Sequence, residues 1–224
     1  MKSIEMNIDT IQEIDLIIFD LDGTLVDSRL DIAISVNHML GSIGFAKKSY
    51  EEIVGYIGRG VKELIRDSLG DENIERFNEG LSLFREHYLK HFLDNTYLYP
   101  NIKDVLEHFK NKKKIVITNK NKDVTLSTLD ALGIDKYFNA IVGGDDENYL
   151  KPDPHYIIKC LKDFGIEPEK AIMVGDMYID VQTGKNAKIT TCAVTYGIGK
   201  RDDFIKYNPD YIIDEIIELK KIIK

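Results

Sequence analysis

The stretch DLDGTLVDS, residues 20–28, contains residue types whose spacing could do chemistry. Asp20 and Asp22 directly follow an apolar run that is typical of a buried strand. Because they are two residues apart, both carboxylates point to the same side of an extended chain. Gly23 permits a tight turn or a close backbone approach to a ligand. An isolated D-x-D is ordinarily a solvated strand end, but the apolar run before this one favours a functional pair of acids.

A second acidic pair stands in GDMYID, residues 175–180. Asp176 and Asp180 are four residues apart at the predicted start of a helix, so they share one face. Like charges at this spacing repel each other unless a cation lies between them. With the first pair they make up to four carboxylates, and that many buried acids need a cation or strongly shifted pKa values. All-oxygen ligands, without a Cys/His cluster, favour Mg²⁺ over zinc.

Positive charge near these acids could come from Lys151, which begins the segment KPDPHYIIK. Pro152 biases this lysine toward extended backbone, so it would stand on a rigid turn. Thr118 and Asn119 end another apolar run and could contribute further polar groups. A lone lysine before proline is ordinarily solvated, and a lone threonine ordinarily completes a strand. Their assignment to a site therefore depends on the surrounding pattern.

Short β-branched runs predict the strands that must position these residues. The runs lie at 16–20, 114–118, 139–144, 171–176 and 190–195. Helical patterns separate the later runs, and this alternation predicts an α/β fold with a Rossmann-like parallel sheet covered on both faces. Ligands of such sheets bind outside the carboxyl ends of the strands. The polar residues that follow the strands would therefore meet in one crevice.

Residues 30–93 differ, because their apolar residues recur at helical spacing and strand-like runs disappear. The pattern predicts an all-helical insertion of residues 28–95. The α/β domain would then comprise residues 1–27 plus 96–224. Polar segments near Asp27 and at 94–96 are the predicted connections and candidate hinges.

Composition argues against several classes of function. The 224 residues carry 38 acids and 30 bases, a net charge of -8 that does not suit a nucleic-acid partner. No window approaches the roughly 18 consecutive apolar residues of a membrane span, and the N-terminal MKSIEMNIDTIQE lacks the apolar region of a secretory signal. Cys160 and Cys192 lie in apolar segments that suit reduced thiols. We therefore expect a cytoplasmic monomer or small homo-oligomer without a membrane partner.

Together these residues resemble the haloacid dehalogenase superfamily, most closely its phosphoglycolate phosphatase-like branch. Four motifs carry the resemblance in the family's order, and they are FDLDGTLVDS at 19–28, VITN at 116–119, KPDP at 151–154 and VGDMYID at 174–180. The helical insertion resembles the family's cap domain, through DIAISVNHML and YIGRGVKEL. Two positions depart from the pattern, because Met177 replaces a small polar residue and Leu150 replaces a basic one.

The resemblance implies a phosphatase that uses Mg²⁺ and acts on a small phosphorylated metabolite such as 2-phosphoglycolate. Asp20 would attack phosphorus to form an aspartyl-phosphate, and Asp22 would protonate the leaving oxygen and later activate water. Mg²⁺ would be held by the Asp20 and Asp176 carboxylates and by the backbone carbonyl of Asp22. Asp180 would act through water or through another ligand.

The same resemblance implies how the phosphoryl group is bound. Thr118, the backbone of Asn119 and Lys151 would hold its oxygens as charge spreads over them in the transition state. Motion of the cap would exclude water during the transfer.

Residues that recognise the leaving group are expected in the helical insertion. Arg59 stands in GRG at 58–60, beside the N-terminus of a predicted helix, which is a natural anion site. We expect it to contact a small carboxylate, the alternative being a solvated arginine in a glycine-rich turn. Lys62 and His38 are weaker candidates for the same role.

Other functions could use a similar core. A sugar phosphomutase would share its residues but form an isomer instead of releasing phosphate, and an inorganic pyrophosphatase would also share them. A dehalogenase needs neither Asp22 nor a metal, and phosphonate cleavage needs a buried lysine in the cap. A phospho-accepting receiver module also combines acids, threonine and lysine on a parallel sheet. Its phosphoacceptor stands on a later strand, however, and it has no large insertion.

Overall fold

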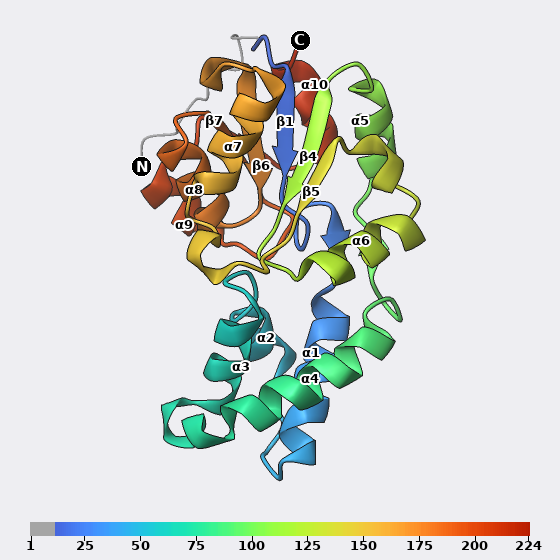
Figure 1. The fold of residues 1–224 in the computed structure, drawn as a ribbon, viewed down its shortest axis with the longest axis vertical. Helices are drawn as coiled ribbons and strands as arrows, with labels where there is room; N and C mark the ends of the chain where they lie inside the picture. The colour runs from blue at the N-terminus through green and yellow to red at the C-terminus, as the bar shows by residue number, and fades with distance from the viewer. Residues whose placement is uncertain (1–11) are drawn as a thin grey trace.

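A computed structural model describes residues 12–224 and contains a parallel six-stranded sheet beside a group of helices (Figure 1). The strands are ordered β5-β4-β1-β6-β7-β8 across the sheet. Their bounds are β1 Leu16–Phe19, β4 Lys113–Ile117, β5 Ala140–Val142, β6 Ala171–Gly175, β7 Thr190–Val194 and β8 Tyr211–Ile213. The predicted α/β fold with a Rossmann-like sheet is therefore confirmed. The predicted lack of a secretory signal concerns residues 1–13, of which 1–11 lie outside the described residues.

The central strand β1 is buried on both faces of the sheet. Ile17 and Phe19 belong to the hydrophobic core on one face, and Leu16 and Ile18 belong to the core on the other. All four side chains are fully buried. Strands covered on both faces read as continuous apolar runs, which explains why no polar residue interrupts this segment.

Helices cover both faces of the sheet (Figure 1). Side chains of α5, α6 and α10 join the core on the face of Phe19, whereas those of α7 join the core on the face of Ile18. The helix α8 packs against β6, β7 and α9. The bounds are α5 Ile102–His108, α6 Lys122–Ala131, α7 His155–Phe164, α8 Tyr178–Asn186, α9 Arg201–Tyr207 and α10 Leu219–Ile222.

The sequence patterns predicted five of the six strands and missed β8. This strand pairs in parallel with β7, and it has only three residues, two of them half-buried. Hydrophobic periodicity cannot identify so short an element. Strands β2 (Val26–Asp27) and β3 (Tyr97–Leu98) were missed for the same reason.

The chain between β2 and β3 is helical, as predicted. Helices α1 and α4 pack side by side, and α2 and α3 lie against them. Their bounds are α1 Arg29–Ser42, α2 Tyr50–Val54, α3 Val61–Leu69 and α4 Phe77–His91. The four helices enclose a hydrophobic core of their own, with Val36, Met39, Ile65 and Phe84 among its buried members. We call this region the helical insertion; its division from the α/β domain at residues 28 and 95 stays a prediction.

The two connections of the helical insertion lie next to each other. Strands β2 and β3 pair antiparallel, with Val26 opposite Leu98. Just beyond this pair, the Asp31 carboxylate accepts hydrogen bonds from the backbone and side-chain N–H groups of Asn95 and from the Thr96 hydroxyl. These bonds tie the start of α1 to the returning chain. They lie at the segments predicted as hinges, and that role also stays a prediction.

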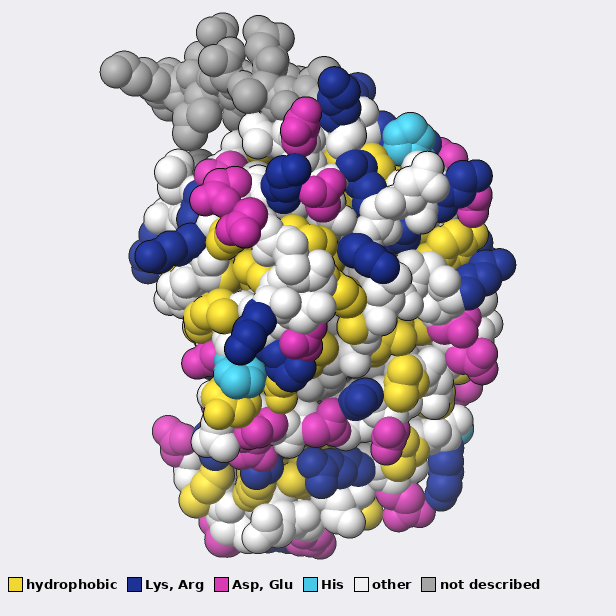
Figure 2. Space-filling view, turned by 45° about the horizontal axis from the view of Figure 1, so that its top comes forward, with side chains coloured by type: hydrophobic (Ala, Val, Ile, Leu, Met, Phe, Trp, Pro, Cys, Tyr) yellow, Lys and Arg dark blue, Asp and Glu magenta, His cyan; other side chains and the backbone are white. Residues whose placement is uncertain are grey.

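Charged side chains of both signs cover the visible surface (Figure 2), and the described helices are too short or too polar to span a membrane. In Figure 2, acidic and basic side chains are interspersed over the visible face. Within residues 12–224, no helix is long and apolar enough to cross a bilayer. Cys160 and Cys192 are buried free thiols, and burial raises the pKa of both.

Candidate active site

The site residues predicted in the α/β domain meet at the edge of the sheet that faces the helical insertion (Figure 1). Asp20, Thr118 and Asp176 each follow the last residue of a strand, β1, β4 and β6 respectively. These three strands are neighbours in the sheet. Because they are parallel, their carboxyl ends lie at the same edge. The fold thus brings together residues that are up to 156 positions apart (20 to 176) in the chain.

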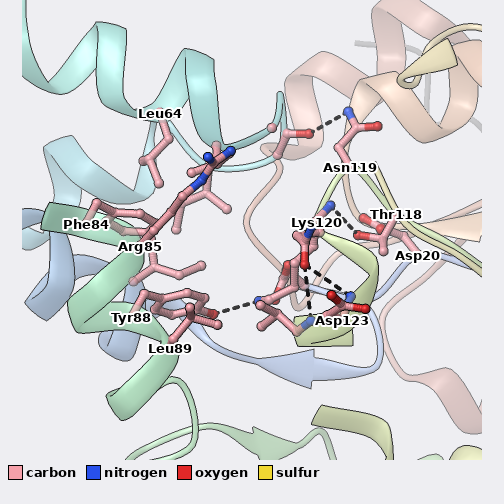
Figure 3. A pocket seen from close by; sticks show the side chains of 18 residues that line it. Asp20, Leu64, Phe84, Arg85, Tyr88, Leu89, Thr118, Asn119, Lys120 and Asp123 are labelled. Atoms are coloured by element: carbon pink, nitrogen blue, oxygen red, sulfur yellow. Dashed lines mark hydrogen bonds and ion pairs between the residues drawn. The ribbon is translucent and has the colours of Figure 1, made fainter. Parts of the chain in front are cut away.

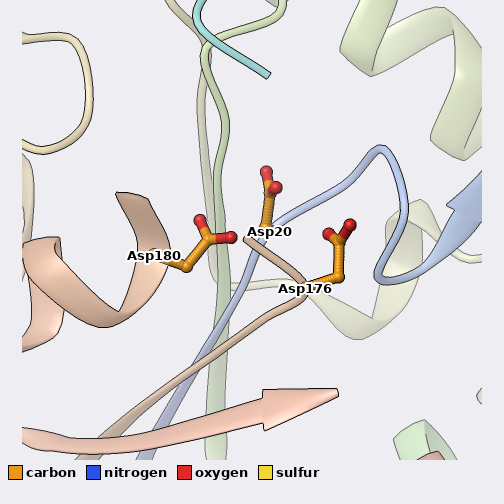
Figure 4. Close-up of side chains that lie close together, drawn as sticks. All are labelled: Asp20, Asp176 and Asp180. Carbon is orange, nitrogen blue, oxygen red and sulfur yellow. The ribbon is translucent and has the colours of Figure 1, made fainter. Parts of the chain in front are cut away.

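Three carboxylates form a buried cluster (Figure 4). Oxygen atoms of Asp20, Asp176 and Asp180 lie within 4.8 Å of one another. Burial, together with the charges of Asp180 and Asp176, raises the pKa of Asp20 to about 8. Burial and the charge of Asp180 raise the pKa of Asp176 to about 7. The cluster is therefore short of positive charge when its acids are ionised.

Lys151 supplies one positive charge to this cluster. Its Nζ lies 2.7 Å from Asp20 Oδ1 and 2.6 Å from Asp180 Oδ1, and only 2% of its side chain is exposed. Burial lowers the pKa of Lys151, but the carboxylates of Asp180 and Asp20 raise this pKa by more, so the ammonium group stays protonated. One ammonium group among three carboxylates leaves an excess of negative charge. The sequence prediction that Lys151 lies beside the acids agrees with this geometry.

The other oxygens of the cluster are held by neighbouring groups. Asp180 Oδ2 accepts a hydrogen bond from the Met177 N–H at 2.9 Å. Asp176 accepts hydrogen bonds from the Thr24 hydroxyl at 2.8 Å and from the Ile198 N–H at 2.7 Å. Both oxygens of Asp180 therefore have partners, the Met177 N–H and Lys151 Nζ. This arrangement suits a role for Asp180 in positioning Lys151. Sequence reasoning did not anticipate Thr24 or Ile198, because their contacts are made only in the fold.

The cluster fits a divalent cation. Its three carboxylates are hard oxygen ligands of the kind that Mg²⁺ and Ca²⁺ prefer. Gly23 has a φ of +91°, and a Cβ at this residue would overlap the Asp176 carboxylate. The turn therefore needs glycine to pass this close to Asp176. A cation would offset the excess negative charge that otherwise raises the pKa values of Asp20 and Asp176.

Asp22 lies apart from this cluster but lines the same cavity as Asp20. Its carboxylate accepts hydrogen bonds from the Ser28 hydroxyl and from Lys120 Nζ, the latter at 2.7 Å. The two aspartates of the D-x-D motif therefore have different partners, Lys151 for Asp20 and Lys120 for Asp22. Lys120 directly follows Thr118 and Asn119, and that adjacency is the sequence signal that could have identified it.

Lys120 also joins the α/β domain to the helical insertion. Its Nζ donates a hydrogen bond to the Tyr88 hydroxyl at 2.7 Å and lies 5.1 Å from the centre of the Tyr88 ring. Burial raises the pKa of Tyr88 to about 12, so the hydroxyl stays protonated. Burial lowers the pKa of Lys120, but the Asp22 carboxylate raises this pKa by more. A buried chain of polar contacts therefore runs from α4 to the second aspartate of the motif.

Thr118 and Asn119 lie where the sequence predicted, beside Asp20 on the cavity wall (Figure 3). Both are buried. Asn119 Oδ1 accepts a hydrogen bond from the Lys151 N–H at 2.8 Å, and Asn119 Nδ2 donates to the Gly58 carbonyl at 3.0 Å. The Asn119 side chain thus holds the turn that carries Lys151 and contacts the helical insertion.

A cavity of about 300 Å³ separates the strand ends from the helical insertion (Figure 3). Its wall on the side of the α/β domain is polar and includes Asp20, Asp22, Thr118 and Lys120. Its wall on the side of the helical insertion is mainly apolar, with Ile32, Ile57, Val61, Leu64, Phe84 and Leu89. Arg85 and Tyr88 of α4 are the polar side chains on that second wall.

The candidates predicted to recognise the leaving group lie elsewhere. Arg59 forms an ion pair with Asp67 of α3, and its side chain is not among those that line the cavity. Lys62 pairs with Glu147 at 2.5 Å. His38 stacks on His87 with the ring centres 4.0 Å apart. The structure thus does not bring these three side chains to the acids, although the neighbouring Gly58 and Gly60 do line the cavity.

The two positions that depart from the family pattern both contact this glycine-containing loop. Gly58 has a φ of +108°, and a Cβ at this residue would overlap the Met177 side chain. A Cβ on Gly60 would lie 3.5 Å from Leu150 Cδ1. Met177 and Leu150 therefore form an apolar contact between the α/β domain and the loop before α3.

Comparisons with known proteins agree with this architecture. The family model described as haloacid dehalogenase-like hydrolase matches residues 17–194. The chain is similar to a phosphoglycolate phosphatase of Aquifex aeolicus, with 37% identity over 92% of this chain and 95% of that protein. It is also similar to phosphoglycolate phosphatase 1 of Pseudomonas aeruginosa, with 36% identity over 91% of this chain and 78% of that protein.

A solved structure shares the fold over nearly its whole length. The crystal structure of a predicted phosphoglycolate phosphatase from Haemophilus somnus has a TM-score of 0.88 and 29% identity. The match covers 94% of this chain and 98% of that one.

Proposed function

The chain belongs to the haloacid dehalogenase-like hydrolase family, and from this premise we propose that it is a Mg²⁺-dependent phosphatase. Its substrate is a small phosphomonoester related to 2-phosphoglycolate, the compound that the names of its relatives indicate. The observation that carries this proposal is the position of Asp20. Its buried carboxylate stands at the end of β1, beside Lys151 and two further acids, and it lines the cavity.

Asp20 acts as the nucleophile. One of its oxygens attacks phosphorus and forms an aspartyl-phosphate, which divides hydrolysis into two easier steps. Lys151 fixes the other end of this carboxylate through the contact at Asp20 Oδ1. Asp180 holds Lys151 in place from the opposite side, and this pairing supports a positioning role for Asp180.

Asp22 acts as the acid and base. It donates a proton to the leaving oxygen in the first step and removes one from the attacking water in the second. Its contacts with Ser28 and Lys120 orient the carboxyl group at the cavity wall. Because Asp20 and Asp22 have separate lysine partners, each can carry out its own role.

The bound cation would be held by the carboxylates of Asp20 and Asp176 and by the backbone carbonyl of Asp22. When bound, it screens the repulsion between the Asp20 carboxylate and the phosphoryl oxygens. Lys151, the Thr118 hydroxyl and the Asn119 backbone offset the remaining charge as it develops on those oxygens. The buried position of these groups supports the proposal, since electrostatic stabilisation is strongest where water is excluded.

A small phosphorylated metabolite is the partner that this function requires. A phosphomutase and an inorganic pyrophosphatase would use the same core residues, and the products of the reaction distinguish them. The cytoplasmic location, the absence of nucleic-acid and membrane partners, and the state of monomer or small homo-oligomer stay predictions.

Phosphate release from 2-phosphoglycolate and from phenyl phosphate tests the proposal. The assay compares the wild type with Asp20→Asn, each with Mg²⁺ and with EDTA. Asp15→Asn serves as a matched control, because Asp15 precedes the same strand but is exposed at the far end of the sheet. We expect metal-dependent release that is lost in Asp20→Asn and retained in Asp15→Asn. Equal activity of Asp20→Asn and wild type would refute the assignment, provided that the variant has not deamidated back to Asp.

A further inference from the structure

Arg85 differs from every other arginine of the chain. Within residues 12–224, five of the six arginines form ion pairs with carboxylates, and these pairs are Arg29–Asp27, Arg59–Asp67, Arg66–Glu63, Arg76–Glu79 and Arg201–Asp214. No ion pair or hydrogen bond of the described residues involves the guanidinium group of Arg85. Arg85 nevertheless lines the cavity, and Figure 3 shows its side chain extending from α4 into the space between the two walls.

Among the described residues, no carboxylate is paired with Arg85. Apart from Tyr88, its neighbours on the same wall are apolar; Phe84 and Leu64 are buried, whereas Leu89 and Arg85 itself are exposed. On the opposite wall, Asp20 and Asp22 are already paired with lysines. Asp123, the remaining acid of the cavity, forms no described ion pair with Arg85. A guanidinium group beside apolar surface offers an anionic ligand a strong, geometrically specific partner.

We propose that Arg85 binds a carboxylate of the leaving group, and that the leaving group carries a hydrocarbon part larger than that of glycolate. This inference rests on the proposed phosphatase function. A single guanidinium group offsets about one negative charge, which suits a carboxylate rather than a second phosphate. The apolar residues around Arg85 bury the hydrocarbon part. The cavity volume of about 300 Å³ lies at the lower end for ligand sites, so the substrate is the phosphate ester of a small hydroxy acid.

Two substrate series test the carboxylate contact. One contains the phosphate esters of glycolate, lactate and 2-hydroxyisovalerate; the other contains methyl, ethyl and isobutyl phosphate, the same three esters without the carboxylate. Arg85→Gln is expected to raise KM for the first series by about tenfold or more, since a charge-assisted bidentate contact is lost. KM for the second series should change by less than about twofold. Arg85→Lys should restore part of the loss.

Arg76→Gln is the matched control, because Arg76 lies just before α4, pairs with Glu79 and does not line the cavity. It should leave both series unchanged. Equal losses for both series in Arg85→Gln would indicate a structural effect and overturn the proposal. Unchanged KM for the carboxylated esters would overturn it as well. Circular dichroism and thermal unfolding establish that each variant is folded.

The same carboxylated series tests the hydrocarbon part on the wild type. Burying each added carbon should raise kcat/KM by about fourfold, up to the size that fills the cavity. A maximum at the glycolate ester would contradict the apolar contact. Asp20-dependent hydrolysis of phenyl phosphate tests the phosphatase function independently of the leaving group. If this hydrolysis occurs but the carboxylate and hydrocarbon tests fail, only the inference about the leaving group is wrong. If this hydrolysis is absent, the proposed phosphatase function is wrong too.

Discussion

The two walls of the cavity differ in how their charges are satisfied. On the side of the α/β domain, Asp20 and Asp180 share Lys151, and Asp176 accepts hydrogen bonds from Thr24, which follows β1, and from Ile198, which follows β7. On the side of the helical insertion, the wall is mainly apolar, and its exposed cation, Arg85, has no carboxylate partner among the described residues. The paired charges of the α/β domain suit phosphoryl transfer, the step that is the same for every substrate. The unpaired charge of Arg85 suits recognition of the leaving group, which differs between substrates.

Loss of the ion pairs that Lys151 forms with Asp20 and Asp180 should have the largest effect. Lys151→Met removes the cation between two buried carboxylates, so we expect a loss of about 3–5 kcal/mol in the free energy of unfolding. Phosphatase activity should fall by about 10²–10³-fold, because a partner of the phosphoryl oxygens is lost. Lys159→Met is the control, since Lys159 forms an exposed pair with Asp163. That variant should cost less than about 1 kcal/mol. Urea unfolding and phosphate release measure both effects, and similar losses in the two variants would contradict the account.

A second prediction concerns the excess negative charge of the same wall. Mg²⁺ at about 100 times its Kd should stabilise the folded protein by about 2.7 kcal/mol, because it binds the folded cluster and not the unfolded chain. Asp176→Asn should remove most of this stabilisation. Thermal unfolding at constant ionic strength, with Na⁺ replacing Mg²⁺ in the control, provides the measurement. Stabilisation by Na⁺ of the same size would indicate screening instead of a site.

A third prediction tests the link between the walls. Tyr88→Phe deletes the hydroxyl that accepts a hydrogen bond from Lys120, and we expect a loss of about 1–2 kcal/mol in stability. Activity should also fall, because Lys120 orients Asp22. Tyr149→Phe is the control, since this ring lies at the surface, stacked on His155. The measurements are chemical unfolding and kcat, made on both variants and on the wild type. A Tyr88→Phe variant as stable and active as Tyr149→Phe would show that the link has no energetic role.

The smallest effect concerns the outer face of the helical insertion. Partial burial and the neighbouring His38 and His91 lower the pKa of His87 from its ordinary value of 6.5, against the opposing charge of Asp94. The unfolded chain therefore binds this proton more readily, so the contribution to stability is complete above 6.5 and decreases as the pH falls toward the lower folded-state pKa. Since His87 is only partly buried, the decrease should stay below about 0.5 kcal/mol.

The measurement is the difference in urea midpoint between about pH 7.5 and pH 5.5. His87→Gln should show a smaller decrease than the wild type across this interval. His108→Gln, an exposed histidine of α5, should behave like the wild type. An identical pH dependence for all three proteins would remove the predicted contribution of His87.

The two walls also differed in how well the sequence predicted them. The strand pattern placed Asp20, Thr118 and Asp176 correctly, because residues that follow neighbouring parallel strands must lie at one edge of the sheet. Lys151 was placed through the motif that contains it. The contacts of Thr24 and Ile198 with Asp176 depend on loop conformations that spacing alone does not define.

On the helical wall, local signals were insufficient. Arg59 stands beside the N-terminus of α3, as predicted, but Asp67 lies within reach and engages its guanidinium group. Phe84 and Tyr88 follow the helical spacing of apolar residues in 30–93, and both are buried on α4. The adjoining Arg85 is exposed and also lines the cavity, and that position depends on how α4 packs against the rest of the fold. A helix surface is oriented by tertiary packing, whereas a strand end is located by the sheet itself.

Chemical trapping of the intermediate decides whether Asp20 carries the phosphoryl group during the reaction. The wild type is quenched during turnover of its best substrate with Mg²⁺, reduced with borohydride, digested and examined by mass spectrometry. Borohydride reduces an acyl phosphate to an alcohol, so we expect homoserine in place of Asp20 in the wild type. Without substrate, Asp20 should be unchanged. Continued phosphate release with Asp20 unmodified, or modification of Asp22 in its place, would show that Asp20 is not the nucleophile.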